Sequence, residues 1–324
     1  MSTPTTVRTA TQIPHLLGLQ GVAASDMRRY LEIARDFATG SRTDRPLEGK
    51  TVANLFFEDS TRTRNSFTVA AHRLGATVID LTGSSSSINK GETLIDTARN
   101  VEAMGVCALC VRAKQSGAAI MLAAGATCPV INAGDGKHEH PTQGLLDAYA
   151  FAEAAGRIDT FDLSGLNIAI VGDIASSRVA RSSIAAMRAL GAKVVTVGPP
   201  GLVPGGLGAE VATNLDKILP DMDAVMMLRI QFERHADGAP PPPAGQGARS
   251  GAIASVREFR EFYALTEARE SRMKQGAIVM HPGPINRGIE LDAAVADGPR
   301  SVILKQVTAG VHVRMAVFAK LAVG

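Results

Sequence analysis

The stretch KTVANLFFEDSTRTRNSFTVAAHRLGATVIDL, residues 50–81, indicates the fold class. Its apolar run at 50–57 predicts a strand, residues 63–74 predict an amphipathic helix, and residues 76–81 predict a second strand. A strand, a helix and another strand in this order are typical of a parallel sheet. The polar residues of the stretch gather where the first strand gives way to the helix.

The same alternation continues along the chain. Further strands are expected at 106–111 and 129–132, with helices at 94–104, 116–124 and from Thr142 to about Ala155. A second series follows, with strands at 166–171, 193–197, 224–228 and 277–280 and helices at 177–190, 209–219 and 266–274. We therefore expect an α/β protein of two units, each a parallel sheet with helices on both faces.

The remaining segments fit around these two units. The helix near Leu145 to Ala155 is expected to join them. Residues 301–323 predict a long apolar helix, interrupted by Gly310, that packs back on the first unit. The segment HADGAPPPPAGQGARS, residues 235–250, predicts a mobile loop because it is rich in proline and glycine.

Composition excludes several classes of protein. A chain of 324 residues predicts two domains, and 45% hydrophobic residues exclude a disordered chain. A net charge of +3 and 4% aromatic residues disfavour nucleic acid as a partner. No apolar run approaches the ~20 residues of a membrane helix, and the polar start lacks a signal core, so neither membrane insertion nor export is expected.

The cysteines point to a reducing compartment. The chain has three, an odd number, which disfavours a disulfide framework. Cys107 and Cys110 form a CxxC pair inside the apolar run VCALCVR. No second pair completes a zinc site, so we expect inert core thiols and a cytoplasmic location.

The strongest chemical signal is Ser60-Thr61-Arg62-Thr63-Arg64, which follows a predicted strand and opens a helix. Free amide groups at a helix N-terminus favour anions, and arginine offers a planar fork that matches phosphate oxygens. One hydroxyl would suffice for capping, so three hydroxyls with two guanidinium groups predict a phosphate site. The sequence GxxxxGKS of the Walker loop is absent.

Two more polar clusters follow later strands. In DGKHEHPTQ, residues 135–143, His140 and Gln143 lie at a helix start, and the spacing lacks the HExxH pattern of a metal site. A neutral histidine or a glutamine donating to a carbonyl oxygen fits this cluster better. In HPGPINRG, residues 281–288, two prolines around Gly283 predict a rigid turn with exposed carbonyl groups.

Taken together, STRTR, HPTQ and HPGPxNRG resemble the aspartate/ornithine carbamoyltransferase family, in this order and at these separations. The resemblance extends from about His15 to Val323. Glu58 before STRTR, the HPGP motif and the run Arg229-Ile230-Gln231 are similar to the aspartate branch. It implies two doubly wound parallel-sheet domains: residues 1–150, completed by a C-terminal helix at 300–324, for carbamoyl phosphate, and 151–299 for aspartate.

The resemblance also implies roles for individual residues. The phosphate would be held by Ser60, Thr61, Arg62, Thr63 and Arg112. Thr63, Arg112 and His140 would reach the carbonyl oxygen of carbamoyl phosphate, while its amino group would meet Gln143 and the backbone carbonyls of Pro282 and Gly283. A cis bond between Gly283 and Pro284 is implied as well. The aspartate carboxylates would bind Arg178, Arg229 and Gln231, and a neighbouring chain would supply Ser86 and Lys90.

The implied reaction is carbamoyl transfer to the aspartate amine, in pyrimidine synthesis, with no metal and no organic cofactor. Five positive groups, on Lys90 and four arginines, would offset about four negative charges on the two substrates. The resemblance further implies a homotrimer with shared active sites, and relatives form larger assemblies with regulatory chains or dihydroorotase. We expect the segment 229–250 to move over the bound substrates, with Glu233 and Arg234 supporting the closed state.

Some features depart from the family pattern or leave alternatives. Thr68, Ala113 and Ser176 stand where relatives often carry other residues. A dinucleotide-binding oxidoreductase is suggested by Ile170-Val171-Gly172-Asp173, but GxGxxG is absent. A carbamoyltransferase for ornithine would set a cationic side chain against Arg229. A paralogue that binds carbamoyl phosphate without turnover is the non-enzymatic alternative.

Overall fold

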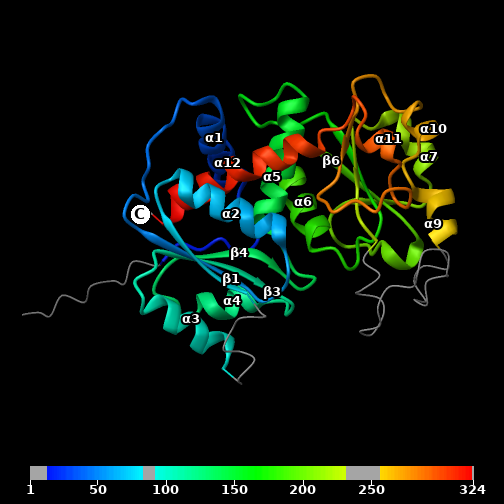
Figure 1. Cartoon of the computed structure of the whole chain (residues 1–324). Coiled ribbons are helices and arrows are strands. Elements are labelled where there is room, and N and C mark those ends of the chain that lie inside the picture. Colours follow the sequence, from blue (N-terminus) through cyan, green and yellow to red (C-terminus); the bar gives the residue numbers. More distant parts are fainter. Residues whose placement is uncertain (1–12, 83–91, 231–255, 323–324) are drawn as a thin grey trace, which may run out of the picture.

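The computed structural model describes residues 13–82, 92–230 and 256–322, which form two parallel sheets (Figure 1). The first sheet has the order β2-β1-β3-β4. Its strands are β1 (Thr51–Phe56), β2 (Thr77–Thr82), β3 (Ala108–Ala113) and β4 (Val130–Asp135). The second sheet has the order β7-β6-β5-β8-β9. Its strands are β5 (Asn167–Val171), β6 (Lys193–Val197), β7 (Glu210–Ala212), β8 (Ala224–Met227) and β9 (Ile278–Met280).

Each sheet reverses its winding direction once. In the first sheet the chain goes from β1 to β2 and then returns to the other side of β1. In the second it goes from β5 outward to β6 and β7 and then returns to the other side of β5. Ligands of open parallel sheets bind beyond the carboxyl ends of the strands at such a reversal. The two reversals therefore mark where a site is expected.

The helices form layers on both faces of both sheets, as the sequence predicted. Between the sheets lie α1 (Ala24–Thr39), α2 (Thr61–Arg73), α5 (Pro141–Ala154), α6 (Arg178–Ala189) and α12 (Ile303–Leu321). The outer face of the first sheet is covered by α3 (Leu94–Glu102) and α4 (Ala118–Ala123). The outer side of the second unit carries α7 (Leu215–Ile218), α9 (Val256–Tyr263), α10 (Glu267–Glu270) and α11 (Ala293–Ala296).

Strand β1 is apolar on both faces because each face packs against a different core. Val52 and Phe56 point into the core between the sheets, whereas Ala53 and Leu55 point into the core under α3 and α4. A strand buried on both faces has no polar side to alternate with the apolar one. The exception is Asn54, whose amide donates to Thr68 Oγ1 (3.1 Å) and Asp80 Oδ1 (2.8 Å).

The prediction of a helix at 209–219 was wrong. The chain first adds β7 beside β6, with Glu210 paired to Val195, and only then forms α7. Backbone pairing at the sheet edge outweighs the apolar spacing of this short run. The helix predicted at 266–274 is also shorter, ending at Glu270, and helices α1, α9 and α11 were not predicted.

The C-terminal helix α12 packs on α1, α2 and α5, as predicted, but Gly310 does not interrupt it. A Cβ atom at Gly310 would lie 2.6 Å from Arg314 Nη1 and 3.1 Å from Leu146 Cδ2. The missing side chain therefore lets α12 approach α5 closely. Tertiary contact, rather than a helix break, explains this glycine.

The cysteines are free thiols. Cys110 and Cys128 are buried, and burial raises the pKa of Cys110 well above its ordinary value and that of Cys128 to about 12. Cys107 precedes β3 and is only half-buried, in contrast to the expectation. Among the described residues, no helix combines the length and apolarity that a bilayer crossing requires.

Candidate active site

A cavity of about 450 Å³ opens where the reversals of the two sheets meet. Residues after β1, with Arg112 near the end of β3, form one wall, and residues after β5 and β8 form the other. The start of α5, the segment after β9 and one side of α12 complete the lining. A volume of this size is typical of a site for small molecules.

The wall after β1 is the N-terminus of α2. Ser60 precedes the helix in an extended conformation, and among the described residues its hydroxyl makes no capping bond. The amide groups of the first helical turn have no partner within the helix and carry the positive end of its dipole. Thr61, Arg62 and Thr63 line the cavity beside them. This arrangement can bind an anion.

Arg62 brings the positive charge of this wall close to two other parts of the cavity. A Cβ atom on Gly283 would lie 3.3 Å from Arg62 Nε, so the guanidinium lies directly against the HPGP segment. The pKa of Arg62 is lowered, first by burial and then by the nearby charge of Arg229. Like charges on opposite walls of one cavity favour a negatively charged ligand between them.

Arg112 and His140 form the floor. Arg112, on β3, donates to the Ala133 carbonyl (3.2 Å) and to Glu58 Oε1 (3.3 Å). His140 is the residue before α5 and is 3% exposed. Burial, with the charges of Arg112, Arg314 and Arg178, holds the pKa of His140 well below its ordinary value. The imidazole is therefore neutral near pH 7, as predicted from the sequence.

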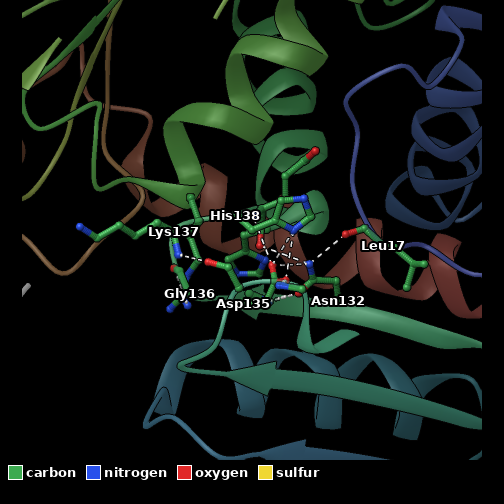
Figure 2. Close-up of polar contacts among 12 residues, drawn as sticks. Leu17, Asn132, Asp135, Gly136, Lys137 and His138 are labelled. Carbon is green, nitrogen blue, oxygen red and sulfur yellow. Dashed lines mark hydrogen bonds and ion pairs between the residues drawn. The ribbon is translucent and has the colours of Figure 1, made fainter. Parts of the chain in front are cut away.

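The loop that carries His140 is held by polar contacts around Asn132 and Asp135 (Figure 2). Asn132 donates to Asp135 Oδ1 (2.8 Å) and to the Leu17 carbonyl (2.9 Å). Asp135 also accepts from the amide groups of Glu139 (3.2 Å) and Gly117 (2.7 Å). These contacts leave the loop little freedom, so the backbone fixes where His140 points.

The HPGP segment adopts the turn that its sequence predicts. The bond between Gly283 and Pro284 is cis, as the family resemblance implied, and Gly283 has a φ of 67°. The Gly283 amide donates to His281 Nδ1 (2.8 Å), and His281 Nε2 lies 3.2 Å from Glu290 Oε1. Pro282 and Gly283 both line the cavity.

The opposite wall begins at α6. Ser177 caps this helix by accepting from the Ala180 amide (3.1 Å), and Arg178 follows at its first position. Arg178 is 5% exposed and forms two hydrogen bonds of 2.7 Å to the carboxylate of Glu58. Glu58 therefore holds arginines of both walls. Arg229, half-buried, follows β8 on the same wall.

Most of the site residues named from the sequence line this one cavity. They are Ser60, Thr61, Arg62, Thr63, Arg112, His140, Gln143, Arg178, Arg229, Pro282 and Gly283. Ser86, Lys90 and Gln231 lie outside the described residues, as do Glu233, Arg234 and the proline-rich segment at 236–250.

The cavity is also lined by four residues for which the sequence predicted no site role: Glu58, His281, Gln306 and Arg314. Glu58 was named only because it is similar to the residue at this position in the aspartate branch of the family. Gln306 and Arg314 stand eight residues apart in α12, with Gly310 midway. Such a spacing places all three on one helix face, and two polar side chains beside a glycine on that face were the signal that could have found them.

Comparisons with known proteins agree on one family. The description "Aspartate/ornithine carbamoyltransferase, carbamoyl-P binding domain" matches residues 14–153, and its "Asp/Orn binding domain" counterpart matches residues 164–321. The aspartate carbamoyltransferase catalytic subunit of Myxococcus xanthus is 52% identical over 307 residues, which cover 94% of this chain and 97% of that one. That of Gluconacetobacter diazotrophicus is 50% identical, covering 94% and 91%.

Solved structures share the fold across the family. The catalytic subunit of M. jannaschii aspartate transcarbamoylase is 32% identical with a TM-score of 0.78, covering 95% of this chain and 97% of that one. Ornithine carbamoyltransferase from Pyrococcus furiosus is 28% identical with a TM-score of 0.80, covering 98% and 99%. Overall shape therefore does not separate aspartate from ornithine enzymes, whereas sequence identity near 50% is shared with aspartate enzymes.

Proposed function

The chain belongs to the aspartate/ornithine carbamoyltransferase family, and we propose that it transfers the carbamoyl group of carbamoyl phosphate to the amine of L-aspartate. The products are N-carbamoyl-L-aspartate and phosphate. The observation that carries this proposal is the cavity where both sheet reversals meet, with Arg62 and Arg112 on one side and Arg178 and Arg229 on the other. Two anionic substrates held side by side require such opposed positive walls.

The first wall is suited to carbamoyl phosphate. Its phosphate would meet Ser60, Thr61, Arg62 and Thr63 at the N-terminus of α2, together with Arg112. Thr63, Arg112 and His140 would donate to the carbamoyl oxygen. The amino group would donate to the Gln143 side chain and to the carbonyl groups of Pro282 and Gly283.

The second wall is suited to aspartate. Arg178 and Arg229 would bind its carboxylates, joined by Gln231 and by Lys90 of a neighbouring chain. Arg178 is bound to Glu58, so aspartate would share this guanidinium with Glu58. An ornithine side chain, being cationic, would be repelled by Arg229.

The reaction would then need no covalent enzyme intermediate. The lone pair of the deprotonated aspartate amine attacks the carbamoyl carbon, and charge develops on the carbamoyl oxygen. Donors from Thr63, Arg112 and neutral His140 stabilise that charge. The bond from carbon to the phosphate oxygen breaks, and the departing phosphate takes the amine proton. The side chains contribute mainly by positioning and by charge.

The larger organisation extends the proposal. We propose residues 1–150 with 300–324 as the carbamoyl phosphate domain and 151–299 as the aspartate domain; the packing of α12 on α1 and α2 supports this division. We also propose a cytoplasmic homotrimer, acting in pyrimidine synthesis, whose neighbouring chain adds Ser86 and Lys90. Regulatory chains or dihydroorotase would be partners of a larger assembly.

Phosphate release from carbamoyl phosphate tests the proposed function. We expect release that depends on aspartate, is not supported by ornithine, and is lost in Arg62→Ala. Arg73→Ala, at the far end of the same helix, is the matched control and should retain activity. Release with ornithine alone would move the chain to the other branch. No release with any amine would contradict catalysis, unless adding a partner chain restored it.

A further inference from the structure

Behind the cavity lies a buried carboxylate that none of the sequence motifs includes. Asp147, on α5, is 0% exposed and lies one helical turn after Gln143. Its Oδ1 accepts from Gln143 Nε2 (2.8 Å) and from Gln306 Nε2 (2.8 Å), and its Oδ2 accepts from Ser183 Oγ (2.8 Å). One carboxylate thus joins α5, α6 and α12.

The charge of Asp147 is compensated in place. Arg314, on α12, is the charged group that acts on it, and the three hydrogen bonds also favour the ionised form. Burial opposes them and raises the pKa of Asp147 to about 6. At neutral pH the group is therefore a carboxylate, which accepts hydrogen bonds at both oxygens and donates none.

This polarity decides how the Gln143 side chain points. A carboxamide has one end that donates and one that accepts, and the two differ little in shape. Because Asp147 only accepts, Gln143 must turn its NH₂ group toward Asp147. Its oxygen then faces the cavity, where Gln143 is 8% exposed.

Asp147 also orients Gln306, which contacts the start of the HPGP segment. The NH₂ group of Gln306 is held by Asp147, so its Oε1 is turned to accept from the His281 amide (2.9 Å). Residues 282 and 283, which line the cavity, follow directly. One buried carboxylate is therefore linked to lining residues on two sides of the cavity.

We infer that Asp147 is a positioning residue: it fixes the Gln143 carboxamide with its oxygen toward the amino group of the carbamoyl donor. This inference rests on the proposed function, since the orientation matters only if an N–H donor binds there. Asp147 touches no substrate itself. Its effect passes through Gln143, and through Gln306 to the turn at His281.

Asp147→Leu tests the inference with a side chain of similar shape that accepts no hydrogen bond. The NH₂ group of Gln143 then has no fixed acceptor, so the Gln143 carboxamide can turn over and present NH₂ to an NH₂ group. We expect the KM for carbamoyl phosphate to rise and kcat/KM to fall by roughly 10- to 100-fold, because a hydrogen bond is replaced by two facing donors. Ser183→Ala, which removes a donor to the same carboxylate away from the cavity, should change kcat/KM by less than about threefold.

The double variant Asp147→Leu/Gln143→Glu separates positioning from simple loss of structure. Its carboxylate, now at position 143, would present an acceptor to the substrate whichever oxygen faces the cavity, at unchanged total charge. We expect it to recover at least about threefold of the kcat/KM lost in Asp147→Leu. In Gln143→Glu alone two carboxylates would face each other, so its loss should exceed that of the double variant.

The outcomes are distinct. An inactive wild type would overturn the proposed function and leave no basis for the inference. An active wild type with Asp147→Leu within about threefold of it, or a folded double variant no better than the single one, would overturn the inference alone. If Asp147→Leu does not fold, the double variant is the test, because its carboxylate restores an acceptor toward the cavity: an active double variant supports the inference, and a folded but inactive one overturns it.

Discussion

Both sheets place a helix N-terminus at their reversal, yet the two termini differ in what they do. At α2 the Ser60 hydroxyl makes no capping bond among the described residues, and at α6 the Ser177 hydroxyl caps its own helix. The first terminus thus offers backbone groups to an anion. The second satisfies its own backbone and presents a side chain, Arg178, which is already bound to Glu58. The same position in a parallel sheet can serve as a binding site or as a support.

The largest expected effect is the loss of kcat when an arginine of the first wall is removed, compared with removal of an arginine of the second wall. Arg112→Ala should lower kcat by roughly 10²- to 10³-fold, because a donor to the developing oxyanion is lost. It should also weaken binding of carbamoyl phosphate measured without aspartate. Arg229→Ala should leave that binding within about threefold while raising the KM for aspartate. Steady-state kinetics with ligand-induced shifts of Tm measure both; equal loss of carbamoyl phosphate binding in both variants would refute the division of labour.

Glu58 tests whether the walls depend on each other. Glu58→Gln should lower the free energy of unfolding by roughly 1–3 kcal/mol, because Arg178 would remain buried without its carboxylate. We also expect the KM for aspartate to rise about tenfold, since Arg178 would lose its fixed position. Denaturant unfolding and kinetics measure these changes, with Glu32→Gln in an exposed ion pair as control. A lower KM for aspartate would instead mean that Glu58 only competes with substrate.

The two serines give the most direct contrast between the termini. Ser60→Ala should raise the KM for carbamoyl phosphate roughly tenfold and leave the unfolding free energy nearly unchanged, because no cap is lost. Ser177→Ala should lower that free energy by about 1 kcal/mol with little change in the same KM. Chemical denaturation measures the unfolding free energy of both variants, and steady-state kinetics measures their KM for carbamoyl phosphate. An equal loss of unfolding free energy in Ser60→Ala and Ser177→Ala would contradict the different roles of the two helix termini.

An effect of similar size concerns His140, whose pKa is lowered by burial and by arginines of both walls. Its pKa in the folded protein lies well below the unfolded value near 6.5, so the unfolded chain binds more protons in acid. Stability from this group is therefore present above about pH 6.5 and is lost as the pH falls. Between about pH 7.5 and 5.5, wild type should lose about 1.4 kcal/mol relative to His140→Gln. Denaturant unfolding at both pH values measures it, and a constant difference would contradict a neutral His140.

The amino-acid sequence alone predicted the fold class and named a set of polar residues that the folded protein gathers around one cavity. Strands buried on both faces are continuous apolar runs, and the polar clusters that follow them at Ser60, His140 and His281 line one cavity. These signals are local, because strand, turn and helix start each occupy a few consecutive residues. The motif resemblance then indicated the family, and it also implied the cis bond at Gly283.

Contacts between distant parts of the chain became visible only in the folded protein. The ion pair from Glu58 to Arg178 joins residues 120 positions apart, and the bond from Asp147 to Gln306 joins residues 159 apart. Gly310 looked like a helix break because its reason, the closeness of Leu146, lies on another helix. Residues 209–219 looked helical because the pairing of β7 with β6 has no local signal. In each case the deciding partner is distant in sequence, and only packing brings it near.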